Sequence, residues 1–109
     1  MSGFYKRMTK YRNIKTTIGD RVFASKREAA HYQKLMLMLK AGLLTHVDCQ
    51  VRYPIIVNGN MICAYVADFV TYDKDGKREV IDVKGVRTRE YIIKKKLMKA
   101  VWAIEIKEV

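Results

Sequence analysis

The strongest constraint on the fold lies in the middle of the chain, where two turn signals separate three β-like segments. The segments cover residues 46–57, 61–72 and 78–83, and the turns between them are Asn58-Gly59 and Asp73-Lys74-Asp75-Gly76-Lys77. An Asn-Gly pair between alternating apolar side chains is a strong signal for a tight hairpin. The second turn also carries a glycine, the residue that suits left-handed loop positions. The pattern therefore predicts three consecutive antiparallel strands.

Two amphipathic helices and a final strand complete the expected fold. The first helix begins at Ser25, which has Glu28 at capping-box spacing, and it ends at Gly42. A second helix is predicted from residue 88 or 89 to about residue 101, and residues 103–109 alternate as a last strand would. The order helix, strand, strand, strand, helix, strand predicts an α/β fold of the α+β type. Its central mixed β-sheet would be flanked by helices.

The chain carries a large excess of positive charge for its length. It has 109 residues and a formal net charge of +11 at pH 7, from 22 Lys and Arg against 11 Asp and Glu. Half of its residues are apolar, which favours one folded domain over a disordered chain. Residues 1–20 are basic and show no sustained period, so we expect a basic N-terminal arm there and a single domain over 21–109. A polyanion such as nucleic acid is the expected partner.

The charge is unevenly distributed along the chain. Ten basic and two acidic side chains lie in residues 1–40, and seven basic and one acidic side chain lie in residues 84–99. Residues 41–83 between them hold six acidic and four basic side chains. A carboxylate cluster repels a phosphate ligand unless a cation intervenes. The acidic middle of the chain therefore needs an explanation of its own.

Several classes of protein are excluded by what the sequence lacks. The longest apolar stretches, residues 35–39 and 61–67, are well short of the ~20 residues that a membrane-spanning helix needs. The basic start of the chain is not followed by the apolar core and cleavage site of a signal peptide. Cys49 and Cys63 lack the spacing of a zinc site, so we interpret both as packing residues. We expect a cytoplasmic protein that does not contact a membrane.

The relative position of two aspartates depends on the loop between the second and third strands. Side chains at i and i+2 of a strand share a face, so Asp82 and Lys84 point the same way. A three-residue loop ending at Gly76 would place Asp68 directly opposite Asp82, whereas a two-residue turn would make Asp82 face away from it. The loop composition permits both registers. The first would let the two carboxylates hold a single divalent ion, and it is the predicted one.

Asp68 and Glu28 each have a structural interpretation as well. Asp68 lies in an otherwise apolar strand, where a salt bridge with Lys84 or an edge position would also account for it. A metal ion would offset the repulsion between two carboxylates more completely than one lysine can. Glu28 completes the capping box, yet it also lies at the edge of the buried stripe of its helix, from which it would reach the same acidic face. Gln50 either lines this cleft or lies on a solvated strand face.

The acidic residues and one lysine occur in a distinctive order. Glu28 lies on the first helix, Asp68 in a strand and Asp82-Val83-Lys84 across a hairpin, and a basic helix follows. This order resembles the PD-(D/E)xK nuclease superfamily, and within it the small phage or bacterial proteins related to Holliday-junction resolvases. The similarity covers residues 23–109 and implies a restriction-endonuclease-like core. Ala67 stands where the motif has proline, which is a backbone position rather than a chemical one.

The resemblance implies a metal-dependent DNA endonuclease that cleaves phosphodiester bonds in branched DNA such as Holliday junctions. Asp68, Asp82 and the Val83 carbonyl would ligate Mg²⁺, for which Mn²⁺ would substitute. Glu28 would complete the shell directly, through water or at a second ion. Lys84 would orient or help to deprotonate the attacking water and would steady the charge on the phosphate. The side chains expected to hold DNA are Arg87, Arg89, Lys94 and Lys95, together with Lys6, Arg7, Lys10 and Arg12 of the arm.

Paired cuts in a junction need two active sites, and one short chain offers a single candidate. We therefore expect a homodimer, for which the apolar run 35–39 is the candidate interface. Two other functions remain open from the sequence: a non-catalytic nucleic-acid-binding module with the same fold, and a nuclease subunit of a larger recombination, transposition or packaging complex. A phage-encoded protein of this kind would act in the bacterial host cell.

Overall fold

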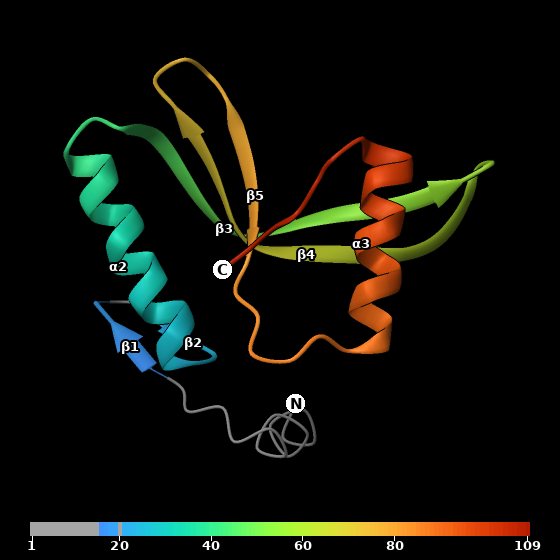
Figure 1. Cartoon of the computed structure of the whole chain (residues 1–109), viewed down its shortest axis with the longest axis horizontal. Helices are drawn as coiled ribbons and strands as arrows, with labels where there is room; N and C mark the ends of the chain where they lie inside the picture. Colours follow the sequence, from blue (N-terminus) through green and yellow to red (C-terminus); the bar gives the residue numbers. More distant parts are fainter. Residues whose placement is uncertain (1–15, 20) are drawn as a thin grey trace.

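Six strands and two helices make up the described part of the chain, which is residues 16–19 and 21–109 of a computed structural model (Figure 1). In chain order they are β1 (Thr16–Ile18), β2 (Arg21–Phe23), α2 (Lys26–Lys40), β3 (Leu44–Val57), β4 (Asn60–Asp73), β5 (Arg78–Asp82), α3 (Arg89–Trp102) and β6 (Lys107–Glu108). The predicted α+β class, with a mixed sheet and two helices, is confirmed. Neither helix in this part of the chain has the length and apolar character needed to cross a membrane.

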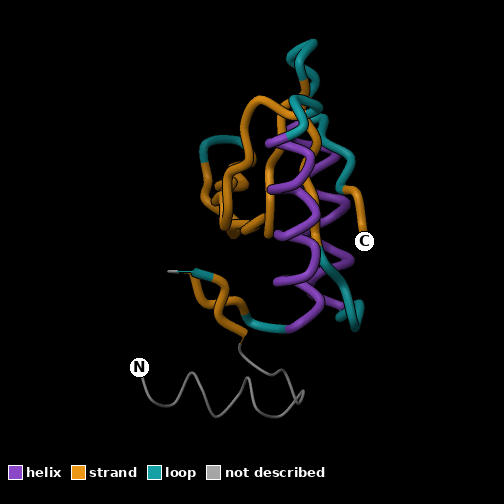
Figure 2. Tube along the Cα trace, turned by 90° about the vertical axis from the view of Figure 1, so that its left-hand side faces the viewer, coloured by secondary structure: helices purple, strands orange, loops and turns teal. Residues whose placement is uncertain are grey.

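A short hairpin, absent from the predicted order, precedes the first helix. Residues 16–18 pair antiparallel with residues 21–23, and Gly19 between them has a φ of +59°. Figure 2 shows this hairpin beside the N-terminal end of α2. Phe23 anchors it there, because its buried ring lies 4.9 Å from the Tyr32 ring of α2, centroid to centroid. Residues 16–18 thus form a strand although the sequence places them in the basic arm, and residues 1–15 of that expected arm lie outside the described residues.

Between β4 and β5, residues 74–76 form a three-residue loop that Asp73 and Lys77 close. The Asp73 amide donates to the Lys77 carbonyl at 3.0 Å, and Gly76 within the loop has a φ of +82°. The Asp73 carboxylate adds two hydrogen bonds, because its Oδ1 accepts from the amides of Asp75 and Lys77 at 2.8 and 2.9 Å. Of the two loops that the sequence permits, the chain therefore adopts the one with glycine at the left-handed bulge position.

This loop fixes the register of the strands that it joins. β5 pairs antiparallel with β4, and residues 69–72 lie opposite residues 78–81. That is the predicted register, and its next step places Asp68 opposite Asp82 at the point where β5 ends. The full strand order is β3-β4-β5-β6, in which β6 is parallel to β5.

The ribbon formed by β3 and β4 bends in its middle, where Figure 1 shows both strands changing direction. The strand pairs on either side of Gln50 are regular, so Gln50 lies opposite Asp68. Gln50 has a φ of +54°, a left-handed conformation that residues other than glycine rarely adopt. The bend therefore falls on Gln50, with Asp68 across from it.

The buried side chains form two clusters, and β3 passes from one cluster to the other at its bend. Before the bend, Val47 and Cys49 of β3 pack against the cluster under α2. After the bend, Tyr53 and Ile55 of the same strand belong to the cluster under α3. The α2 cluster contains Phe23, Ala29, Leu35, Leu44, Phe69 and Ile81, and the α3 cluster contains Tyr53, Ile55, Tyr65, Ala67, Val70, Val80, Tyr91, Met98, Ile104 and Ile106.

The C-terminal segment forms a shorter strand than the sequence predicts. β6 covers Lys107–Glu108, whereas the alternation indicated a strand over 103–109. Ala103 has a φ of +56° and ends α3, so the chain turns there instead of starting a strand. Ile104 and Ile106 are buried in the α3 cluster. Their burial accounts for the apolar alternation without strand pairing.

We predict that Gly76→Ala lowers the free energy of unfolding by about 1 kcal/mol, because alanine disfavours the left-handed backbone of this loop position. Gly85→Ala is the control, since Gly85 lies outside the left-handed region and a Cβ there would meet no atom within 4 Å. Chemical denaturation of both variants measures the difference. Equal stabilities would show that the loop, and the register it sets, does not need its glycine.

Candidate functional site

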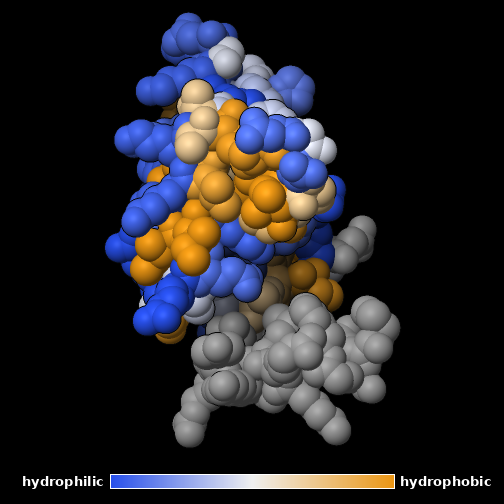
Figure 3. Space-filling view, turned by 90° about the vertical axis from the view of Figure 1, so that its right-hand side faces the viewer, coloured by the Kyte–Doolittle hydropathy of each residue, from blue (hydrophilic) through white to orange (hydrophobic). Residues whose placement is uncertain are grey.

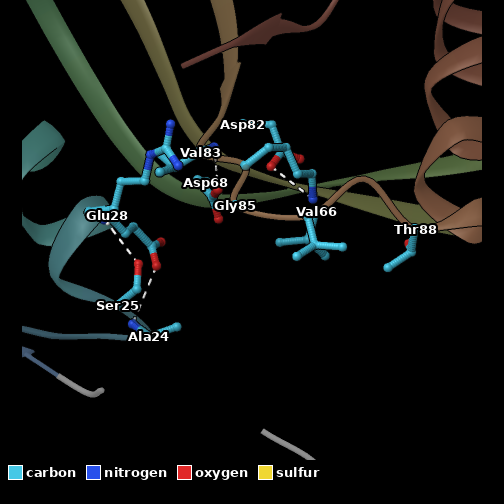
Figure 4. A pocket seen from close by; sticks show the side chains of 12 residues that line it. Ala24, Ser25, Glu28, Val66, Asp68, Asp82, Val83, Gly85 and Thr88 are labelled. Carbon is cyan, nitrogen blue, oxygen red and sulfur yellow. Dashed lines mark hydrogen bonds and ion pairs between the residues drawn. The ribbon is translucent and has the colours of Figure 1, made fainter. Parts of the chain in front are cut away.

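A cleft of about 480 Å³ opens between the first turns of α2 and α3 (Figure 4). Its walls come from the start of α2, the bent part of β4 and the segment that follows β5. The four side chains that the sequence predicts as catalytic, Glu28, Asp68, Asp82 and Lys84, all line this cleft, and so does Val83. The fold thus brings these residues together from distant parts of the sequence.

Glu28 reaches the cleft from the first turn of α2. Ser25 caps the helix by accepting a hydrogen bond from the Glu28 amide at 3.1 Å, as the capping-box spacing predicts. The Glu28 carboxylate is shared, because Oε1 accepts from the Ala24 amide at 3.3 Å and Oε2 accepts from Nε2 of Gln50 at 2.9 Å. Both interpretations of Glu28 therefore apply: one carboxylate oxygen accepts from the amide just before the helix, and the other accepts from the sheet at the acidic cleft.

Asp68 lies at the bend of β4 and holds the end of β5. Its Oδ2 accepts from the Val83 amide at 2.8 Å, and its Oδ1 accepts from Nε2 of Gln50 at 3.4 Å. Burial raises the pKa of Asp68 from an ordinary 3.8 to about 7; the Val83 amide opposes this rise, and the charges of Glu28 and Asp82 add to it. The raised pKa thus marks Asp68 first as a buried carboxyl and second as one with two other acids nearby.

Asp82 is buried, with 3% of its surface exposed. Its Oδ1 pairs with the Lys84 ammonium at 3.0 Å, and its Oδ2 accepts from the Tyr65 hydroxyl at 2.6 Å. Burial, followed by this hydrogen bond, raises the pKa of Tyr65, so its hydroxyl remains a donor. The lysine therefore pairs with Asp82, and not with Asp68 as the alternative interpretation of the sequence would have it.

Two tyrosines complete the surroundings of Asp82 and Lys84, and sequence reasoning missed both. Tyr65 donates to Asp82, and the Lys84 ammonium lies 3.9 Å from the centroid of the Tyr91 ring. Tyr91 in turn donates to Glu108 at 2.8 Å; burial, followed by this hydrogen bond, raises its pKa. The helical spacing of Tyr91 predicts that its ring is in the core, but it does not predict the contact between that ring and the Lys84 ammonium. No local pattern in the sequence links Tyr65 to Asp82.

Gln50 joins two acids that come from different elements. Its Nε2 donates to Glu28 of α2 and to Asp68 of β4. Both interpretations of Gln50 apply in part, because the residue is exposed and does not itself line the cleft, yet its side chain contacts two acids that do. The signal that could have found it is its position opposite Asp68, which is visible only once the register of β3 and β4 is known.

The donor chemistry of the cleft decides whether it suits a cation. All six carboxylate oxygens of Glu28, Asp68 and Asp82 accept from a protein donor. Among the described residues, no three His, Cys, Asp or Glu side chains form a group that would hold a metal ion. The acids thus line one cleft without meeting at one point, because Gln50 bridges two of them and Lys84 pairs with the third. Carboxylate and carbonyl oxygens are nevertheless the donors that Mg²⁺ prefers, so the donor types fit this ion.

The expected DNA-binding residues around α3 are partly engaged with acids. Three of the four form ion pairs: Arg87 and Lys95 with Glu108 at 3.4 and 2.9 Å, and Lys94 with Glu90 at 3.5 Å. Arg89 is exposed and makes no ion pair within residues 16–19 and 21–109. The candidates in the arm, Lys6, Arg7, Lys10 and Arg12, lie outside the described residues.

The fold and the cleft together define a small α+β domain with an acidic, lysine-containing cleft between two helix starts. The chain belongs to the family DUF1064, described as a protein of unknown function, whose model matches residues 8–108. No curated protein and no solved structure matches the chain. Its function is therefore argued from the contacts described above.

We predict that Asp68 makes the metal-free protein less stable as the pH rises from about 4 to about 7. Folded Asp68 keeps its proton up to a pKa of about 7, whereas the unfolded chain loses it near the ordinary value of 3.8. Between these values the folded state binds more protons than the unfolded state, so the free energy of unfolding falls with rising pH and levels off above 7. Asp68→Asn should remove this part of the pH dependence.

Urea denaturation in EDTA at a series of pH values measures the effect. Asp48→Asn changes an exposed carboxyl of β3 and is the control, which should keep the wild-type profile. If Asp68→Asn keeps the wild-type dependence of stability on pH as well, the pKa of Asp68 is not raised in the folded protein and the prediction is wrong.

Proposed function

We propose that this protein is a metal-dependent DNA endonuclease of the PD-(D/E)xK type, acting on branched DNA such as Holliday junctions. The observation that carries the proposal is the Asp82–Lys84 pair, 3.0 Å apart, in the same cleft as Asp68 of a strongly basic chain. Two acids and a lysine, one acid at the bend of β4 and the other two groups where β5 ends, are groups suited to metal-assisted phosphodiester hydrolysis. Such an enzyme would act in the cytoplasm, and in the bacterial host cell if it is phage-encoded.

Oxygen donors for Mg²⁺ would come from both strands of the β4–β5 hairpin. Asp68, Asp82 and the Val83 carbonyl would hold the ion, and Glu28 would complete its surroundings directly, through water or at a second ion. Bound Mg²⁺, or Mn²⁺ in its place, supplies a more acidic water and offsets charge on the phosphate. The raised pKa of Asp68 supports this placement, because a cation relieves the crowding of negative charge at that side chain.

Lys84 is the side chain proposed to act on the attacking water and on the phosphate. It is 25% exposed and lines the cleft, so a ligand can reach its ammonium. Asp82 on one side and the Tyr91 ring on the other restrict where that ammonium can lie. From there it would orient or help to deprotonate the water, and would stabilise the charge that develops on the phosphate.

The surroundings of the cleft favour a phosphate backbone as ligand. α2 and α3 both begin at the cleft, capped by Ser25 and Thr88, and helix N-termini attract anions. Arg27 also lines the cleft, and Arg87 and Arg89 lie on either side of the Thr88 cap. Together with the net charge of +11, these groups support nucleic acid as the substrate class.

We predict that Asp82→Asn lowers Mg²⁺-dependent cleavage of a labelled four-way junction by more than about a hundredfold, because a buried ligand and the partner of Lys84 are lost together. Lys84→Gln should lower cleavage by about 10²–10³-fold. Glu105→Gln, which changes an exposed acid paired with Lys99, is the matched control and should cleave normally. Gel separation of the products measures cleavage, and junction binding in EDTA confirms that each variant is folded.

A non-catalytic nucleic-acid-binding module is the second candidate. The observation that favours it is that every carboxylate oxygen of the three acids already has a protein donor. This function predicts junction binding with no cutting in Mg²⁺ or Mn²⁺, and binding that Asp82→Asn leaves unchanged. A nuclease subunit of a larger recombination, transposition or packaging complex would use the same cleft, and its cutting would depend on the same variants.

Paired cuts would need two copies of the chain, and α2 offers an apolar face for the contact. Leu35 of the predicted 35–39 interface is buried within its own chain, whereas Leu37 is 69% exposed. A hollow of about 430 Å³ at this face is lined by Ile18, Tyr32, Gln33, Met36, Leu37 and Lys40. We propose that α2 of one copy packs against α2 of the other in a symmetric homodimer.

Leu37→Glu should convert this dimer into a monomer, because it would bury an unpaired carboxylate at the interface. Ile62→Glu is the matched control: Figure 3 shows apolar side chains gathered on the side of α3 and the β3–β4 hairpin end, where Ile62 is 55% exposed. Size-exclusion chromatography with light scattering measures the mass. If Ile62→Glu breaks the dimer and Leu37→Glu does not, the interface lies on the face of Ile62 and not on α2. A monomeric wild type would exclude the dimer.

A further inference from the structure

Gln50 combines an unfavourable backbone conformation with contacts to two acids. Its φ of +54° lies in the left-handed region, which is unfavourable for a residue with a long side chain and persists only where the surrounding structure holds it. Its Nε2 lies 2.9 Å from Oε2 of Glu28 and 3.4 Å from Oδ1 of Asp68. The unfavourable conformation and the two contacts thus occur at the same residue.

The two acids come from different elements, Glu28 from a helix and Asp68 from the sheet. Their side chains hydrogen-bond to each other only while one of them carries a proton, and their like charges repel once both are ionised. Each carboxylate also accepts from a nearby amide: Glu28 from Ala24, just before the same helix, and Asp68 from Val83 at the end of β5. Within the described part of the chain, Gln50 is the donor whose hydrogen bonds reach both carboxylates.

A glutamine suits this position because it donates without carrying charge. The side-chain amide has two N–H groups, so one nitrogen can donate to both carboxylates. A lysine or arginine in its place would also bridge the acids, but its positive charge would repel a divalent cation from the same oxygens. An uncharged bridge therefore holds the acids near each other while leaving their negative charge available.

We propose that Gln50 is a positioning residue for the cleft, which holds the Glu28 carboxylate against Asp68 and so prepares both acids to bind a divalent cation. This inference rests on the proposed function and deepens it, because it names a residue that sets cation affinity without reacting itself. Groups that orient metal-binding side chains typically change metal affinity by about 10–100-fold when they are removed. The loss of Gln50 should therefore weaken cation binding and leave the fold intact.

Two substitutions distinguish the effect of the Gln50 side chain from the effect of its left-handed backbone. Gln50→Gly accepts a φ of +54° without strain, so its melting temperature should equal or exceed that of wild type. Gln50→Asn also tolerates this backbone, but its shorter side chain would not reach both acids. Asn58→Gly, which changes another left-handed residue, with a φ of +50° in the exposed β3–β4 turn, is the matched control. Isothermal titration of each full-length protein with Mn²⁺ alone measures binding.

We expect the Kd for Mn²⁺ to rise about tenfold in Gln50→Gly and Gln50→Asn and to stay unchanged in Asn58→Gly. The Ala24 amide should also exchange its hydrogen faster in Gln50→Gly than in wild type in EDTA, because its acceptor on Glu28 is no longer held. Unchanged or tighter Mn²⁺ binding by both Gln50 variants would overturn the proposal, as would a wild type that binds no Mn²⁺. A wild type that binds Mn²⁺ and cuts no junction would overturn the proposed nuclease function and not the role of Gln50.

Discussion

A strand of fourteen residues cannot offer one face to two helices at different places in the molecule unless it bends. In this chain the bend falls on Gln50 of β3, opposite Asp68 of β4, and it lets β3 support the α2 cluster along its first half and the α3 cluster along its second. The same bend carries the middle of β4 to the starts of both helices, where the cleft opens. The left-handed residue is unfavourable in isolation, and its side-chain hydrogen bonds to two acids offset that cost. Fold and candidate site thus depend on the same few atoms.

The parts of this structure that the sequence predicts are those determined by contacts over a few residues. The β4–β5 register follows from Gly76 and from the Asp73 carboxylate, which bonds amides two and four residues away. The helix starts follow from Ser25 and Thr88, each of which caps an amide three residues on. Because the loop fixes the register, the placement of Asp68 opposite Asp82 follows as well.

The features that escaped prediction depend on contacts between distant segments. The bend carries no glycine or asparagine that would mark it, since Gln50 is held there by Glu28 from another element. Alternation shows that Ile104 and Ile106 are buried, but it does not distinguish core packing from strand pairing, so β6 is shorter than expected. The sequence also predicts one meeting point for three acids and a lysine. The structure divides them, because Lys84 pairs with Asp82 while Gln50 bridges the other two.

This division has an electrostatic consequence for what the cleft can hold. The ammonium of Lys84 compensates Asp82 directly, whereas Glu28 and Asp68 receive neutral donors, and burial with crowding raises the pKa of Asp68. The residual negative charge of the cleft is therefore concentrated between Glu28 and Asp68, and an added positive charge there would relieve the most repulsion. The cleft also lies between two helix N-termini and beside Arg27, which attract anions. A basic chain with its acids gathered in this way can draw a phosphate and a cation into one cleft by opposite attractions.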